Sequence, residues 1–270
     1  MTTSAKPQEQ QQHSNIPHIA VTGLSKEFGG YLAVNNIDLS VDPGEIFGFL
    51  GPNGAGKTTT IKMLAGLLRP DQGRILINNH DMASEPIICK QQTGYIPDRP
   101  YLYEKLTGQE FLQFIASLYH LPADIFERNV DHYLKIFDLN DWRHHLVESY
   151  SHGMKQKLII TSAFMLEPPL IIVDEPMVGL DPKSARIVKE IFKKHAAKGG
   201  SVFLSTHSLE IAEELCDKIA IIQQGKIRAT GNLTSLRHEA KLEGSGLEEI
   251  FLELTGAHEL QAIISALRSQ

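Results

Sequence analysis

The stretch GPNGAGKTT, from Gly51 to Thr59, decides the fold of this chain. It matches the pattern GxxxxGK[ST], and it lies between an apolar run, Glu45–Leu50 (EIFGFL), and a predicted helix over Lys57–Leu67. In this order of strand, turn and helix, the glycines let backbone N–H groups point inward, and the start of the helix adds a partial positive charge. The turn is therefore predicted to bind phosphate groups through Gly51, Pro52, Asn53, Gly54, Ala55, Gly56, Lys57, Thr58 and Thr59.

Two carboxylates follow a second apolar run. Leu170–Val173 (LIIV) is typical of a central parallel strand, and it ends in Asp174 and Glu175, where open α/β sheets bind ligands. An acidic strand end alone is often merely solvated, but its position downstream of the phosphate-binding turn favours a functional role. We expect Asp174 and the Thr58 hydroxyl to hold Mg²⁺, and Glu175 to polarise an attacking water. Lys57 is expected to reach the β and γ phosphates.

Strand patterns recur along most of the chain. His18–Leu24 and Asn36–Val41 are typical of edge strands in an antiparallel flank, and Lys218–Thr230 is typical of a hairpin. Asp181 and Pro182 form the N-cap and first position of a helix that follows the acidic strand. Strands that alternate with helices predict an α/β fold: a P-loop NTPase core, RecA-like, with a mainly parallel sheet and an antiparallel β flank.

One helical stretch interrupts this alternation. Thr107 and Glu110 form a capping box that opens a helix, and a further helix is predicted over Ala123–Phe137. We interpret residues 98–166 as an inserted α-helical subdomain of an ATP-binding domain over 18–235, whose core is formed by 18–97 and 167–235. The polar segment 1–17 is predicted to be a disordered tail, and 236–270 a C-terminal helical extension.

Further motifs surround these two in a fixed order. Tyr150–Gln156 (YSHGMKQ) opens a helix and resembles the signature usually written LSGGQ. Val178–Asp181 (VGLD) resembles a D-loop, and Ser205–His207 (STH) resembles the loop that carries a switch histidine. Phe28, in the stretch SKEFG, stands where an adenine-stacking aromatic is usual. With the phosphate-binding turn and the acid pair, these motifs cover about residues 20–230 and resemble the ATP-binding domain of ABC transporters.

The resemblance implies a function and a mechanism. It implies that the chain binds ATP and Mg²⁺, hydrolyses ATP and forms a head-to-tail dimer with a second ATP-binding subunit. Each ATP would lie between the phosphate-binding turn of one subunit and the signature of the other, whose Ser151 and Gly153 would bind the γ phosphate. Asp181 and His207 would complete the site, and Phe28 would stack on adenine. From the residues alone, Ser151 could be only a helix cap, and Phe28 only a packing residue.

The resemblance also implies a membrane partner. ABC ATP-binding subunits energise transport through permease subunits, so we expect transmembrane permease partners and a position at the cytoplasmic face of the cell membrane. Tyr101–Tyr103 (YLY) falls in the region that receives a short helix of the permease, although packing within the helical subdomain is equally open. Closure of the dimer on two ATP molecules would move this subdomain against the permease.

The chain departs from the common family pattern at three positions. Asp98, in the stretch TGYIPD, stands where most members have glutamine. A carboxylate could still bind Mg²⁺ or water, but it lacks the amide donor. His152 and Met154 replace a glycine and a glutamine of the signature. With an acid at position 98, this stretch resembles that of the ABC-2, drug-export-type branch of the family. The resemblance implies export as the direction of transport.

Composition narrows the function classes. The chain has 270 residues, a net charge of -6 and a pI near 6.1, and this acidic balance argues against a nucleic-acid partner. The alternative function is a soluble ABC-type ATPase that acts on ribosomes or nucleic acid. A P-loop kinase would not need a signature or a switch histidine. A non-hydrolysing nucleotide-binding regulator would not need to retain Lys57 and Glu175.

Cysteines and apolar runs add little. Cys89 and Cys216 stand far apart, and both are predicted to be buried reduced thiols. The N-terminus lacks the apolar core of a secretory signal. No stretch reaches the roughly 18 apolar residues that span a bilayer, so any membrane crossing is expected to come from a partner.

Overall fold

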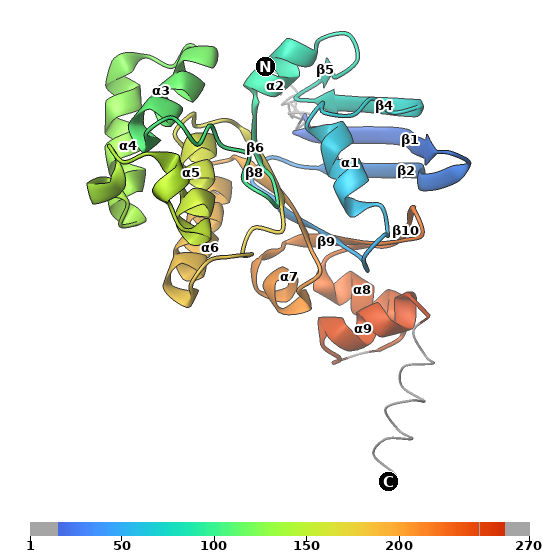
Figure 1. Cartoon of the computed structure of the whole chain (residues 1–270). Helices are drawn as coiled ribbons and strands as arrows, with labels where there is room; N and C mark the ends of the chain where they lie inside the picture. Colours follow the sequence, from blue (N-terminus) through green and yellow to red (C-terminus); the bar gives the residue numbers. More distant parts are fainter. Residues whose placement is uncertain (1–15, 243, 257–270) are drawn as a thin grey trace, which may run out of the picture.

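The structure is a computed structural model that describes residues 16–242 and 244–256 (Figure 1). The strands of this part form a six-stranded sheet, in the order β10-β9-β3-β8-β7-β6, and a four-stranded sheet, in the order β2-β1-β4-β5. The four-stranded sheet and α1 lie on one side of the larger sheet in Figure 1, and α3, α4 and α5 lie on the other. The predicted P-loop NTPase fold is confirmed.

The larger sheet is parallel except at one edge. Only the hairpin of β9 and β10 is antiparallel, as the sequence predicts. The remaining neighbours, β9-β3, β3-β8, β8-β7 and β7-β6, all pair in parallel. Every residue of β3, β7 and β8 is buried, as expected for central strands covered on both faces. The strands are β3 (Ile46–Leu50), β6 (Thr93–Ile96), β7 (Leu170–Asp174), β8 (Ser201–Thr206), β9 (Lys218–Gln223) and β10 (Lys226–Gly231).

The smaller sheet is antiparallel, but the prediction of two edge strands is wrong for one of them. β1 (Ile19–Phe28) pairs with β2 (Tyr31–Val41) on one side and with β4 (Gln72–Ile77) on the other, so of the two predicted strands only β2 lies at an edge. The error has a physical reason: alternation of apolar and polar residues reports which face of a strand is buried, not how many neighbours the strand has. The short strand β5 (His80–Asp81) completes the sheet.

Helices connect the strands and cover the sheets. The predicted cap of α6 by Asp181 is confirmed, and Ser208 caps α7. The sequence did not predict α2, β5 or β6, which are short. Near the end of the chain, α7, α8 and α9 pack together around a small cluster of buried side chains (Figure 1). The helices outside the 98–166 stretch are α1 (Lys57–Leu64), α2 (Pro86–Gln91), α6 (Pro182–Ala197), α7 (Leu209–Leu215), α8 (Leu233–Ala240) and α9 (Leu247–Leu254).

Between β6 and β7 the chain is helical, as predicted. The capping box at α3 is present: Glu110 N–H donates to Thr107 Oγ1 at 3.2 Å, and Thr107 N–H donates to Glu110 Oε2 at 2.8 Å. The signature stretch opens α5 as expected. Whether this segment is a separate subdomain with the predicted boundaries stays a prediction. The elements are α3 (Gly108–Leu118), α4 (Ala123–Ile136), α5 (His152–Phe164) and two single-turn helices, Asn140–Trp142 and Val147–Ser149.

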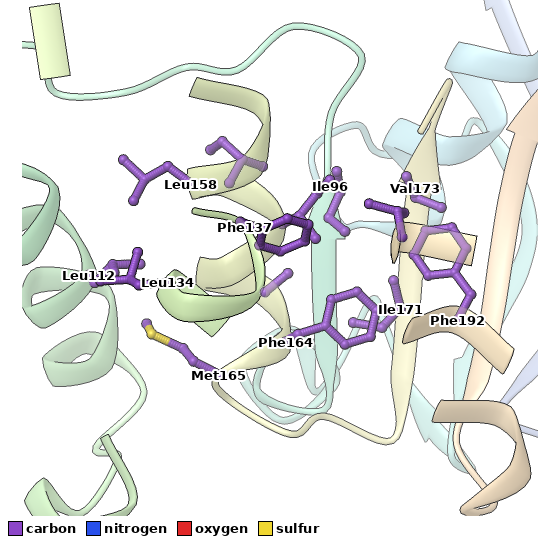
Figure 2. Packing of buried hydrophobic residues seen from close by; sticks show 14 of the residues in the cluster. Ile96, Leu112, Leu134, Phe137, Leu158, Phe164, Met165, Ile171, Val173 and Phe192 are labelled. Carbon is purple, nitrogen blue, oxygen red and sulfur yellow. The ribbon is translucent and has the colours of Figure 1, made fainter. Parts of the chain in front are cut away.

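One hydrophobic cluster joins this helical segment to the large sheet (Figure 2). Leu112 on α3 and Leu134 on α4 belong to it, and so do Phe164 on α5 and Ile171 and Val173 on β7. Because all these side chains share one close-packed cluster, α5 and the strand that carries the acid pair are held together by side-chain packing. The opposite face of the sheet packs into a second cluster, shared with α1 and the antiparallel sheet.

The remaining predictions concern the cysteines, membrane spans and the chain ends. Cys89 and Cys216 are free thiols, and Cys89 is buried as predicted, whereas Cys216 is only partly buried. None of the helices in the described part of the chain combines the length and apolar character of a membrane span. The predicted disordered tail falls almost entirely on residues 1–15, and the end of the predicted C-terminal extension falls on 257–270; both lie outside the described residues.

Candidate nucleotide-binding site

Most of the predicted site residues line one cavity of about 450 Å³. It lies at the carboxyl ends of β3 and β7, where the phosphate-binding turn, the acid pair and the loop after β8 meet. Parallel neighbours end at the same edge of a sheet, so segments far apart in the sequence are brought together there. The cavity is lined by Tyr31, Ala33, Asn53, Gly54, Gly56, Lys57, Thr58, Thr59, Asp98, Asp174, Glu175, Val178 and His207.

The phosphate-binding turn needs its glycines for two reasons. Gly56, at the start of α1, has φ +110°, a conformation that residues with a side chain rarely adopt. A Cβ atom at Gly56 would also collide with the Ala33 carbonyl oxygen, and one at Gly51 would collide with the Ile222 carbonyl oxygen. Gly51, Pro52 and Ala55 do not line the cavity; Gly51 and Ala55 are buried, and Pro52 is exposed.

Lys57 is held against the turn. Its Nζ donates to the Gly51 carbonyl at 2.6 Å and to the Pro52 carbonyl at 3.2 Å. Burial lowers the pKa of Lys57, and the nearby charges of Glu175 and Asp174 act in the opposite direction. The ammonium group is therefore partly desolvated, and among the described residues its hydrogen-bond acceptors are two neutral carbonyls, an arrangement in which an incoming phosphate group would compete well for it.

The acid pair is fixed by the neighbouring strand. Asp174 is buried at the end of β7, and the Ser205 hydroxyl of β8 donates to its carboxylate. Glu175, the next residue, has φ +50°, and its backbone N–H donates to the Ser205 carbonyl at 3.1 Å. Its carboxylate lies 3.3 Å from the Thr206 hydroxyl and 2.8 Å from Nδ1 of His207. Sequence reasoning missed the supporting roles of Ser205 and Thr206, whose position after an apolar run was the available signal.

Three acidic residues line the cavity. Asp98 lines the cavity together with Asp174 and Glu175. Burial and the nearby Asp174, Tyr101 and Asp98 raise the pKa of Tyr95 to about 12. Among the described residues, no group of three or more His, Cys, Asp or Glu side chains could hold a metal ion by itself. A cation here would therefore need further oxygen ligands, such as those of a phosphate.

The residues predicted to act on the ATP of a second subunit, Ser151, Gly153 and Asp181, also lie outside the cavity lining. Ser151 caps α5, where its Oγ accepts from Met154 N–H at 3.3 Å. Gly153 lies against the loop after β7. Asp181 caps α6 by accepting from the N–H and the hydroxyl of Ser184, and these bonds hold the pKa of its carboxyl well below the usual range. None of these three residues therefore lines the cavity together with the phosphate-binding turn.

Phe28 also lies outside the lining, and a different aromatic residue takes part in it. Phe28 ends β1 with its side chain half-exposed, and the Lys26 ammonium lies 5.5 Å from the centre of its ring. Tyr31, which pairs with Phe28 across the hairpin turn, lines the cavity, and its hydroxyl lies 3.5 Å from the Gly54 carbonyl. Sequence reasoning missed Tyr31; a second aromatic just beyond the Gly29-Gly30 turn was the signal that could have found it.

A second cavity lies beside the start of α5. It has a volume of about 660 Å³, and its lining includes the predicted Tyr101–Tyr103 stretch together with His152 and Lys155. Tyr101 is 84% exposed and Tyr103 is 60% exposed, so both rings are available to a partner. His152, which replaces a glycine of the usual signature, lines this cavity, and its ring also lies close to Gly179 in the loop after β7.

Comparisons with known proteins agree on one family. A family model described as “ABC transporter” matches residues 34–178. The ABC-type transporter ATP-binding protein EcsA of Bacillus subtilis (strain 168) is 38% identical over 230 residues, which cover 84% of this chain and 93% of that protein. The fluoroquinolones export ATP-binding protein MT2762 of Mycobacterium tuberculosis (strain CDC 1551 / Oshkosh) is 38% identical over 247 residues, or 88% of this chain and 80% of that protein. A solved structure of an ATP-binding subunit of an ABC transporter is 39% identical with a TM-score of 0.85, covering 87% of this chain and 98% of its own.

The family match includes most of the residues that line the cavity. The family match contains the phosphate-binding turn, the signature and the acid pair. The similar structure has the same arrangement of sheets and helices over nearly its whole length. The chain belongs to the ABC transporter family, in which it is an ATP-binding subunit that hydrolyses ATP.

Proposed function

We propose that this subunit drives export through a separate membrane permease by closing, as a dimer, on two ATP molecules. One observation carries the proposal. Lys57, Glu175 and His207 line one cavity, whereas Ser151 and Gly153 of the signature in the same chain do not line it. A γ phosphate held by the cavity would be enclosed fully only if a second subunit supplied its signature, so the geometry favours a head-to-tail pair.

The residues of the cavity have separate roles in hydrolysis. Lys57 binds the β and γ phosphates, and the backbone N–H groups of Gly51–Thr59 surround them. Oxygen donors of Thr58, Asp174 and Asp98 suit Mg²⁺, which prefers one or two carboxylates together with phosphate oxygens and supplies charge neutralisation when bound. Glu175 polarises the attacking water.

The switch histidine acts together with the carboxylate beside it. His207 orients the attacking water and contacts the γ phosphate, and its bond to Glu175 keeps the ring at the mouth of the cavity. Of the predicted nucleotide ligands, Phe28 is assigned to the adenine ring, where its half-exposed face is free to stack. Ser151, Gly153 and Asp181 act on the ATP of the other subunit. The exposed N-terminus of α5, with its partial positive charge, suits a γ phosphate from that side.

The permease would dock in the second cavity, beside the start of α5. Exposed tyrosines are common anchors of protein interfaces, and Tyr101 and Tyr103 lie next to the loop that carries Asp98. We assign the helices of 98–166 to a subdomain that carries motion from the nucleotide to the permease, within a domain over 18–235. The subunit would then work at the cytoplasmic face of the membrane. Export is favoured by the fluoroquinolone-export relative and by Asp98.

Trapping the closed dimer tests the proposal. Glu175→Gln keeps the size of the side chain but removes its charge, so we expect ATP to bind and hydrolysis to stop. Light scattering after gel filtration with Mg²⁺ and ATP should show a dimer for this variant and a monomer without nucleotide. Glu210→Gln, at a carboxylate on α7 that does not line the cavity, is the matched control and should behave as the parent does. Parental hydrolysis by Glu175→Gln, or a monomer with bound ATP, would sink the proposal.

A further inference from the structure

Gln156 on α5 has a fully buried side chain whose amide is unpaired. Neither its amide oxygen nor its amide nitrogen has a hydrogen-bond partner among the described residues. Buried amides normally bond to protein or to ordered water, and leaving both atoms unpaired costs free energy. Methionine or leucine would fill this space without polar atoms. The amide therefore points to a partner that becomes available in another arrangement of its surroundings.

The residues on either side of Gln156 are tied to two different loops. Lys155 Nζ lies 2.6 Å from a carboxylate oxygen of Glu104, in the loop after β6. Lys157 Nζ lies 3.4 Å from a carboxylate oxygen of Asp181, in the loop between β7 and α6. Gln156 therefore occupies the part of α5 where the helix meets both loops.

A contact one helical turn before Gln156 favours the β7–α6 loop as the partner of the Gln156 amide. Gly153 precedes Gln156 by one helical turn and shares its side of α5. A Cβ atom at Gly153 would lie only 2.9 Å from the Gly179 carbonyl oxygen, so α5 and the β7–α6 loop are in close contact here. The Gly179 carbonyl oxygen is thus a backbone group of the loop that begins at Glu175, and it lies close to α5 one turn before Gln156.

The β7–α6 loop, residues 175–181, is loosely bonded within itself. Its internal backbone hydrogen bonds, from Val178 N–H to the Glu175 carbonyl and from Leu180 N–H to the Met177 carbonyl, are both 3.3 Å long. Bonds of this length are weak, so the loop can exchange them at low cost for bonds to another group. The buried amide of Gln156 offers one donor group and one acceptor for such an exchange.

We propose that Gln156 is a positioning residue for ATP hydrolysis. When ATP is bound, backbone groups of loop 175–181 turn to the Gln156 amide, and these bonds hold Glu175 in line with the γ phosphate. The inference rests on the role proposed above for Glu175. It has a distinctive consequence: the amide destabilises the protein without nucleotide and stabilises the protein with ATP.

Two variants of the full chain separate this role from a structural one. Gln156→Met keeps the shape of the side chain and removes both polar atoms. Thr161→Val is the matched control, because Thr161 is equally buried on α5 but its hydroxyl already donates to the Lys157 carbonyl at 2.9 Å. For each protein, Tm is measured with and without Mg²⁺ and ATP, and kcat and KM for ATP are measured at steady state.

For Gln156→Met we expect the Tm without nucleotide to rise, and both the ATP-induced rise in Tm and kcat to fall. Gln156→Met should raise the Tm without nucleotide by about 2–4 °C, reduce the rise in Tm caused by ATP, and lower kcat about tenfold with KM within about threefold. Thr161→Val should lower the Tm without nucleotide and leave the rise caused by ATP unchanged. A lower Tm for Gln156→Met without nucleotide would mean that the amide already has partners, and this result would overturn the inference.

A parallel measurement on Glu175→Gln keeps the inference and the proposed function distinct. If Glu175→Gln stops hydrolysis while Gln156→Met retains the parental kcat, the proposed function stands and the inference fails. If Glu175→Gln hydrolyses ATP at the parental rate, the proposed function fails and the inference fails with it.

Discussion

Oε1 of Glu175 and Nδ1 of His207 lie 2.8 Å apart, although 32 residues separate the two in the sequence. They meet because β7 and β8 are parallel neighbours with Asp174 opposite Ser205, so the residues just beyond each strand emerge at the same edge. Glu175 has φ +50°, a conformation that costs a residue with a side chain about 1 kcal/mol or more. Such local strain is common where a side chain is aimed at a ligand.

Removing the imidazole of His207 should slow hydrolysis more than it weakens binding. We expect His207→Ala to lower kcat about 100-fold, because the positioning of the attacking water is lost, while the Kd for ATP changes little. Steady-state phosphate release and equilibrium binding of a fluorescent ATP analogue measure the two effects. His144→Ala, at an exposed histidine outside the cavity, should match the parent. An unchanged kcat for His207→Ala would remove the histidine from the mechanism.

Loss of the Lys57 ammonium should abolish the effect of ATP on stability. ATP at 100 times its Kd stabilises the parent by about 2.7 kcal/mol, and Lys57→Met should lose nearly all of it. Thermal unfolding with and without Mg²⁺ and ATP measures this difference. Lys62→Met, at an exposed position of the same helix, provides the comparison and should keep the full shift. A full ATP-induced shift in Lys57→Met would mean that the cavity is not the phosphate site.

Two glycines of the turn should respond differently to alanine. At Gly56, alanine meets both φ +110° and the Ala33 carbonyl oxygen, so we expect a loss of roughly 3 kcal/mol or more in the free energy of unfolding. At Gly54, φ is +76° and nothing lies within 4 Å of an added Cβ, so only about 1 kcal/mol should be lost. Urea denaturation compares the two variants directly, and equal losses would contradict the packing argument.

Mixing two inactive variants should restore hydrolysis if the sites are shared between subunits. A Lys57→Met subunit cannot bind ATP in its own cavity but keeps its signature, whereas a Ser151→Ala subunit keeps its cavity. A mixed dimer therefore contains one intact composite site. We expect the equimolar mixture to hydrolyse ATP faster than either variant alone at the same total concentration. If the mixture shows only the average of the two rates, Ser151 does not act across the dimer.

The fold and the phosphate-binding turn could be predicted because each rests on a local pattern. Glu45–Leu50 and Leu170–Val173 are short apolar runs followed by polar motifs, and such runs become buried strands whatever lies beside them. The caps at Thr107 and Asp181 could be predicted for the same reason, since a cap depends only on the next few residues.

What could not be predicted depends on contacts between distant segments. The double pairing of β1 involves β4, which the alternating pattern of β1 does not encode. Tyr31 lines the cavity only because the β1–β2 hairpin reaches Gly54. The unpaired amide of Gln156 likewise could not be predicted from the sequence. A glutamine amide can bond to water when it is exposed or to protein groups when it is buried, so the residue type alone does not show whether it has a partner.

The two hydrophobic clusters on either side of the large sheet also fix the register of β7, the strand that carries the acid pair. Leu170 and Ile172 of β7 belong to one cluster, and Ile171 and Val173 belong to the other. Sliding β7 by a single residue would exchange these pairs between differently shaped interiors and move Asp174 by about 3.3 Å. The position of the Asp174 and Glu175 carboxylates thus depends on how four aliphatic side chains pack, and none of these four side chains lines the nucleotide cavity.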